Sequence, residues 1–134
     1  MSQVYKYMVA TRCMTYNHSL YIEEALRGFA MQETTFPIVF CVVDDASTDG
    51  EQNLLLEWTK NNLELNDDGS LPCKQMPYGK LVFARSIKNN NAYFAILLLS
   101  ENHYRKKDKL PYIKESQRLR AHAALSRTRQ SGQP

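Results

Sequence analysis

An adjacent pair of carboxylates, Asp44 and Asp45, is the feature of this sequence that most clearly suits ligand chemistry. The pair follows residues 38–43, an apolar run rich in Val and Ile without alternation, which predicts a strand buried on both faces. Open α/β sheets bind ligands beyond the carboxyl ends of such strands. Because two carboxylates beside a buried strand are costly without a partner, we expect ligand donors or a metal ion to compensate them.

A helix is expected directly after the acidic pair. Thr48 and Glu51 have the spacing of a capping box, which predicts that a helix begins within about one turn of the pair and extends to about Asn62. Trp58, the single tryptophan, has core spacing with neighbouring leucines, so we interpret it as a packing residue. The acidic turn is therefore predicted to join a strand to a helix.

A second polar loop is expected to face the acidic pair. Residues 5–14 predict a first strand, residues 15–19 (Thr-Tyr-Asn-His-Ser) are typical of a β-to-α loop, and residues 20–32 predict an amphipathic helix. With the strand before the acidic pair, these segments form a βαβ unit, whose two strands are parallel. Tyr16 and Asp44 should therefore lie at the same edge of the sheet.

The remainder of the chain is less regular. Residues 66–79 contain Gly, Pro and Asp-Asp turn signals and are predicted to be a loop, whereas residues 80–84 fit either a short strand or part of a helix. Residues 93–99 predict a further buried strand. Asn102 and His103 follow that strand, so they either line the same crevice or belong to a surface loop.

The length and composition are those of one globular domain. The chain has 134 residues, of which 43% are hydrophobic and 23% are charged. No apolar run approaches the roughly 18 residues that a membrane-spanning helix requires, and the N-terminus lacks the layout of a secretion signal. Three cysteines without C-x-x-C spacing argue against a disulfide framework or a zinc site, and they fit a cytoplasmic location.

Basic residues are concentrated near the C-terminus. Residues 1–113 carry 12 Lys and Arg against 13 Asp and Glu, whereas residues 114–134 carry 5 against 1. We therefore expect a folded unit over residues 1–113 and a basic, poorly ordered tail over residues 114–134. Because the tail has neither interleaved aromatic residues nor a recognised motif, no nucleic-acid partner is expected.

Other interpretations of these features remain open. The acidic turn could be merely polar, with its aspartates capping the next helix. A receiver-like signalling module also has an acidic pair after a strand, and it would be phosphorylated at Asp44 or Asp45. A basic protein would bind nucleic acid through residues 114–134 in a salt-dependent way. A non-catalytic nucleotide-binding fragment is the last alternative.

Three segments together resemble the N-terminal half of family 2 glycosyltransferases, which have the GT-A fold. They are A-T-R-C-M-T-Y-N-H-S-L-Y-I-E-E-A-L (10–26), M-Q-E-T (31–34) and V-V-D-D-A-S-T-D-G (42–50). The resemblance is close over residues 4–63 and loose to about residue 113. It implies an α/β, Rossmann-like parallel sheet of about three strands with helices on both faces and an incomplete C-terminal half.

In that family the first loop and the acidic pair hold the nucleoside of a sugar nucleotide, usually a UDP-sugar. By this resemblance Tyr16 would stack on or flank the base, while Asp44 or Asp45 would accept hydrogen bonds from the base imide or the ribose hydroxyls. The nucleotide-binding residues implied by the resemblance are Thr15, Tyr16, Asn17, Asp44, Asp45 and Ser47.

The sequence departs from the family pattern where catalysis would occur. A GT-A enzyme uses a D-x-D turn to bind Mg²⁺ or Mn²⁺ and a downstream Asp or Glu to deprotonate the acceptor hydroxyl, and the 134 residues contain no D-x-D. We therefore assign no catalytic residue and interpret the chain as the nucleotide-binding half of a larger glycosyltransferase, inactive alone. The resemblance implies a saccharide or lipid-linked acceptor and is compatible with peripheral membrane association of the parent enzyme. An uncovered sheet edge would favour self-association.

Overall fold

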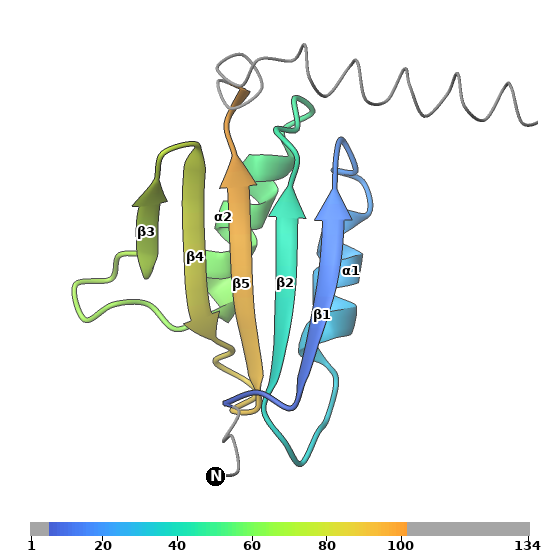
Figure 1. Ribbon diagram of the computed structural model, residues 1–134, viewed down its shortest axis with the longest axis vertical. Helices are drawn as coiled ribbons and strands as arrows, with labels where there is room; N and C mark the ends of the chain where they lie inside the picture. The colour runs from blue at the N-terminus through green and yellow to red at the C-terminus, as the bar shows by residue number, and fades with distance from the viewer. Residues whose placement is uncertain (1–5, 102–134) are drawn as a thin grey trace, which may run out of the picture. The chain divides into compact units, whose positions relative to one another are not determined.

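In the computed structural model, which describes residues 6–101, the chain forms one five-stranded mixed sheet with two helices (Figure 1). The strands and helices are β1 (Val9–Thr15), α1 (Ile22–Ala30), β2 (Ile38–Asp44), α2 (Glu51–Asn62), β3 (Cys73–Met76), β4 (Gly79–Arg85) and β5 (Ala92–Leu99). The strand order across the sheet is β1-β2-β5-β4-β3. The α/β class and the two predicted helices are confirmed. Asn102, His103 and residues 114–134 lie outside the described residues.

Three strands, β1, β2 and β5, are parallel, as predicted. The antiparallel part of the sheet corrects the prediction of a loop over residues 66–79, because β3 lies within that segment and pairs with β4. All four residues of β3 are exposed. Because no face of this strand is buried, its sequence does not need the hydrophobic alternation that would predict a strand. β3 is held by its pairing with β4. Residues 80–84, for which the sequence allowed a strand or a helix, belong to β4 and are therefore a strand.

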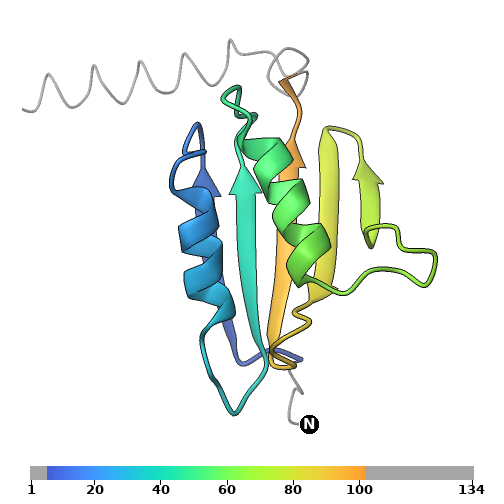
Figure 2. The same ribbon diagram turned by 180° about the vertical axis from the view of Figure 1, so that it is seen from behind.

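Both helices cover the same face of the sheet, so the prediction of helices on both faces is wrong for the described residues (Figure 2). The strand order gives the reason. From β1 to β2 and from β2 to β5 the chain moves across the sheet in one direction, and crossovers of the same hand that move in one direction lie on the same face. Helices on both faces would require a reversal of that direction.

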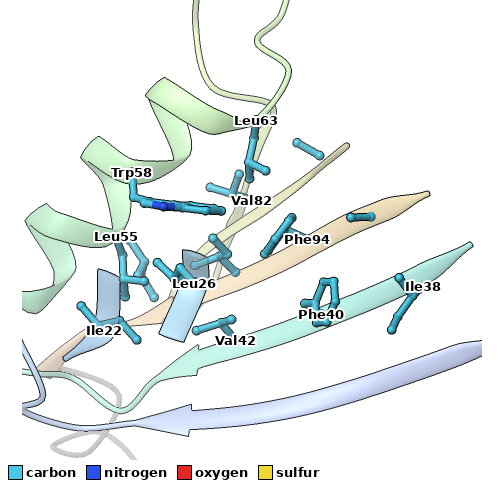
Figure 3. Close-up of a cluster of buried hydrophobic side chains, with 14 residues drawn as sticks. Ile22, Leu26, Ile38, Phe40, Val42, Leu55, Trp58, Leu63, Val82 and Phe94 are labelled. Atoms are coloured by element: carbon cyan, nitrogen blue, oxygen red, sulfur yellow. The ribbon is translucent and has the colours of Figure 1, made fainter. Parts of the chain in front are cut away.

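The core lies between the sheet and this helical layer (Figure 3). Phe94 of β5 is fully buried at its centre, with its ring centroid 5.3 Å from Phe40 of β2 and 5.1 Å from Trp58 of α2. Leu26 from α1 and Leu55 from α2 are also fully buried. The interpretation of Trp58 as a packing residue is therefore confirmed, and these contacts fix α1 and α2 over the parallel strands.

Gly79, at the start of β4, is a position where an added methyl group should be costly. An alanine Cβ there would overlap the carbonyl oxygen of Leu98 and lie 3.1 Å from its carbonyl carbon. We expect Gly79→Ala to lower the free energy of unfolding by about 2 kcal/mol, because the backbone must shift. Gly28→Ala, in α1 with open space around it, should instead raise it by about 0.5–1 kcal/mol. Urea unfolding of both variants followed by circular dichroism would test this contrast, and equal stabilities would contradict it.

Within residues 6–101, neither helix is long and apolar enough to cross a membrane.

Candidate functional site

The carboxyl ends of β1 and β2 meet at one edge of the sheet, as expected from the βαβ pattern (Figure 1). Thr15, the last residue of β1, is in register with Asp44, the last residue of β2. The backbone N–H of Asp45 donates to the carbonyl of Thr15 at 2.9 Å, which continues the pairing one residue further. Tyr16 and Asp45 therefore follow neighbouring strands at the same point. The loop that contains Tyr16 and the turn that contains Asp44 and Asp45 lie side by side, and we call them together the rim.

Hydrogen bonds join the two loops of this rim. The N–H of Asn17 donates to Ser47 Oγ at 2.9 Å, and the N–H of Thr48 donates to Asn17 Oδ1 at 2.8 Å. Asn17 adopts a left-handed backbone with φ of 54°, which places its side chain and its N–H against the second loop. The polar atoms of Asn17 and Ser47 in these bonds hold the two loops together, which the sequence could not show.

Glu51 occupies the junction between the loops. Its side chain is fully buried, and its carboxylate accepts hydrogen bonds from the Thr15 hydroxyl, from the His18 N–H at 2.8 Å and from Ser47 Oγ at 3.0 Å. The predicted capping box with Thr48 is wrong, because α2 begins after Gly50 in a left-handed conformation and has no side-chain cap. Glu51 instead turns toward the first loop. The spacing of Thr48 and Glu51 was visible in the sequence, but it predicted a hydrogen bond within the start of the helix and not one to the first loop.

Asp44 is the more deeply placed member of the acidic pair. Its side chain is fully buried, and its Oδ2 accepts the N–H of Ser47 at 3.1 Å and the side-chain amide of Gln52 at 2.6 Å. The same Gln52 amide donates to the carbonyl of Leu99 at 2.7 Å, so it links β2 to the end of β5. The second carboxylate oxygen, Oδ1, is buried and has no hydrogen-bond partner in the described part of the chain. Sequence reasoning missed Gln52, since nothing in its spacing indicated this role.

Asp45 and Tyr16 are the rim residues whose side chains make no hydrogen bond to another described residue. The carboxylate of Asp45 is half-buried and accepts no hydrogen bond among the described residues, and the Tyr16 side chain is 53% exposed. Thr15, by contrast, is buried with its hydroxyl bound to Glu51. All six residues assigned by resemblance lie at the rim, and Tyr16 and Asp45 have side chains without a hydrogen-bond partner among the described residues.

The N-terminus of α2 is occupied by carboxylates of the chain. Asp49 accepts the N–H of Glu51 at 3.1 Å and the N–H of Ser19 at 2.9 Å. The backbone hydrogen bond from Ser19, above all, lowers the pKa of Asp49 below its ordinary value, so this carboxylate is charged at neutral pH. A helix N-terminus can bind phosphate, but here the negative charges of Asp49 and Glu51 oppose it.

The negative charge of Glu51 also acts on Cys13 in β1. Burial chiefly raises the pKa of the Cys13 thiol, and the charge of Glu51 adds to this effect. Cys13 packs against the hydrophobic core and forms no disulfide. It is therefore a neutral packing residue.

Residues 6–101 contain no group of three or more His, Cys, Asp or Glu side chains that could hold a metal ion. A hollow of about 390 Å³ lies elsewhere, between the C-terminal parts of α1 and α2, where Arg27, Trp58, Asn62 and Ser86 contribute to its wall. None of the residues predicted from the sequence to bind a ligand lines it.

Comparison with known proteins identifies relatives of undetermined function. A stretch of 45 residues, 34% of this chain, is 47% identical to proteins described as uncharacterized from Mycobacterium bovis and Mycobacterium tuberculosis. The matched stretch covers 13% of each relative's length, so the chain corresponds to a small part of them. The sequence matches no known protein-family profile, and no solved structure matches the chain.

Proposed function

We propose that residues 6–101 bind the nucleoside of a nucleoside-diphosphate sugar, with UDP as the expected nucleotide, and form the donor-binding half of a GT-A glycosyltransferase. The observation that carries this proposal is the pairing, at one edge of the sheet, of an exposed Tyr16 ring with an Asp45 carboxylate that has no partner within residues 6–101. A base needs a flat aromatic surface and a hydrogen-bond acceptor for its N–H group. The Tyr16 ring supplies the aromatic surface, and the Asp45 carboxylate supplies the acceptor.

The strand order supports this assignment over a receiver-like module. Numbered by their place in the chain, the parallel strands β1, β2 and β5 lie in the order 3-2-1, as in the first half of a Rossmann fold. Receiver-like folds place the first strand between the second and the third. In a Rossmann fold the ligand crevice lies outside the carboxyl end of the first strand, where Tyr16 follows β1.

The two aspartates have different roles in this proposal. Asp44 aligns the turn through Ser47 and Gln52, and Asp45 accepts the hydrogen bonds of the base imide or the ribose hydroxyls. Thr15, Asn17 and Ser47 shape the loops that present Tyr16 and Asp45. In this proposal the two side chains that contact the ligand, those of Tyr16 and Asp45, both bind its nucleoside part.

The parent reaction is transfer of the sugar to a hydroxyl of a saccharide or lipid-linked acceptor, with inversion in one in-line displacement. A bound Mg²⁺ or Mn²⁺ would neutralise the leaving diphosphate in the parent enzyme. Since the sequence has no D-x-D turn and the described residues contain no metal-binding group, we derive no step through such an ion. We expect the chain alone to bind nucleotide weakly without turnover.

Self-association through a sheet edge would use β1 rather than β3. Both strands are at the ends of the sheet in the described part of the chain. β1 has seven residues, whereas β3 has four, and short edge strands resist pairing with another chain.

Titration of the full chain with UDP, followed by amide chemical shifts, tests the proposed function. We expect the largest shifts at Tyr16 and Asp45, with smaller ones at Asp44, because a stacked base changes the magnetic environment of both loops. Amides of the remote turn around Asp67 and Gly69 should not move. Inorganic diphosphate should produce no comparable shifts, because the rim is acidic. If millimolar UDP shifts none of the rim amides, nucleoside binding is ruled out.

A further inference from the structure

Glu51 is a buried carboxylate without a compensating cation among residues 6–101. Its side chain is fully buried, and no Lys or Arg of the described residues forms an ion pair with it. Removing a carboxylate from water costs several kcal/mol unless hydrogen bonds replace those of water. Well-packed apolar residues in place of buried charges are often neutral or stabilising. Fold stability alone therefore gives little reason for a glutamate at this position.

The hydrogen bonds of Glu51 connect three parts of the rim. Thr15 and His18 flank Tyr16 in the first loop, Ser47 follows Asp45 in the second loop, and Glu51 itself belongs to the first turn of α2. The three donors are separated from Glu51 by 36, 33 and 4 residues, so the carboxylate joins segments that are distant in sequence. Since Tyr16 lies between two of its donors, a change at Glu51 should alter how the ring is presented.

We propose that Glu51 is a positioning residue for nucleoside binding, which holds the Tyr16 loop and the Asp45 turn at the distance and orientation that a nucleoside requires. The inference rests on the proposed function and extends it to a residue that does not touch the ligand. A site held in place before binding loses less conformational entropy when the ligand binds. The carboxylate is the acceptor in all three bonds. A glutamine has one acceptor oxygen and an NH₂ group that must face at least one of the three donors, so either a hydroxyl must reverse its bond or a bond is lost.

The test uses the full chain with Glu51→Gln, which keeps the shape of the side chain and removes its charge. Glu57→Gln is the matched control, because Glu57 is an exposed residue of the same helix. Binding of UDP is measured from amide shifts, and stability from thermal unfolding. We expect the Kd of Glu51→Gln to rise about 10-fold or more, the loss typical of hydrogen bonds to a charged group, and that of Glu57→Gln to stay unchanged.

The measurement separates positioning from folding. Below the unfolding transition nearly all molecules are folded, so reduced stability by itself leaves Kd unchanged. If Glu51→Gln binds UDP as tightly as the wild type, whatever its stability, the inference is overturned. If Glu51→Gln fails to fold, Thr15→Val replaces it, and a Kd raised about 3-fold or more is expected because one of the three bonds to Glu51 is lost while the shape of the side chain is kept.

Hydrogen exchange distinguishes failure of this inference from failure of the proposed function. The His18 N–H, which donates to Glu51 at 2.8 Å, should exchange about 10-fold faster in Glu51→Gln than in the wild type. If the wild type does not bind UDP, the proposed function is wrong, and exchange still shows whether Glu51 holds the loop. Unchanged exchange at His18 would overturn the role of Glu51 even if UDP binds.

Discussion

Replacement of Asp45 by alanine is expected to raise the Kd for UDP by about 10- to 100-fold. This corresponds to the loss of a hydrogen bond to a charged acceptor, about 1.5–3 kcal/mol. Asp45 is the member of the acidic pair whose carboxylate is free, whereas Asp44 is buried and bound by Ser47 and Gln52. Because the side chain of Asp45 makes no hydrogen bond within the described residues, Asp45→Ala should leave the fold intact. Isothermal titration calorimetry or the amide-shift titration measures the effect.

Asp67→Ala is the control for this substitution. Asp67 is an exposed aspartate in the turn before β3, away from the rim, and its loss changes the net charge by the same amount. UDP binding should therefore be unaffected. Equal weakening by both substitutions would indicate a general charge effect, and unweakened binding in Asp45→Ala would show that Asp45 does not contact the nucleoside.

Phe94→Ala is expected to have the largest effect on stability. The Phe94 ring is fully buried between the sheet and the helices, in contact with Phe40 and Trp58. Truncating such a side chain costs about 3–5 kcal/mol, of a total that is about 5–15 kcal/mol for ordinary domains. The variant should unfold at a much lower urea concentration or be partly unfolded in buffer. Circular dichroism during urea titration provides the measurement.

Phe83→Ala is the matched control in the neighbouring strand. Phe83 of β4 is 41% exposed, so its truncation removes less buried area and leaves no closed cavity. We expect a loss of about 1 kcal/mol. If the two variants had the same urea midpoint, Phe94 would not be at the centre of the core.

Much of the parallel half of the fold was predictable from the sequence. Apolar runs and turn residues are local signals, and they predicted β2, β5 and both helices to within a few residues. The sequence also predicted that Tyr16 and Asp44 share an edge, because two strands joined through a helix are parallel and so end on the same side. The position of the candidate site at this edge was therefore predictable from the βαβ pattern alone.

Other features were decided only by the tertiary structure. The antiparallel pairing of β3 depends on the edge that β4 offers, and the single helical layer depends on the direction in which the chain crosses the sheet. The role of Glu51 depends on hydrogen bonds from Thr15 and His18, which are 36 and 33 positions away. Which carboxylate of the acidic pair stays free depends on the bonds that Ser47 and Gln52 donate to Asp44. Local patterns determine which residues form strands, helices and turns, but the choice of a hydrogen-bond partner depends on atoms that only the folded chain brings together.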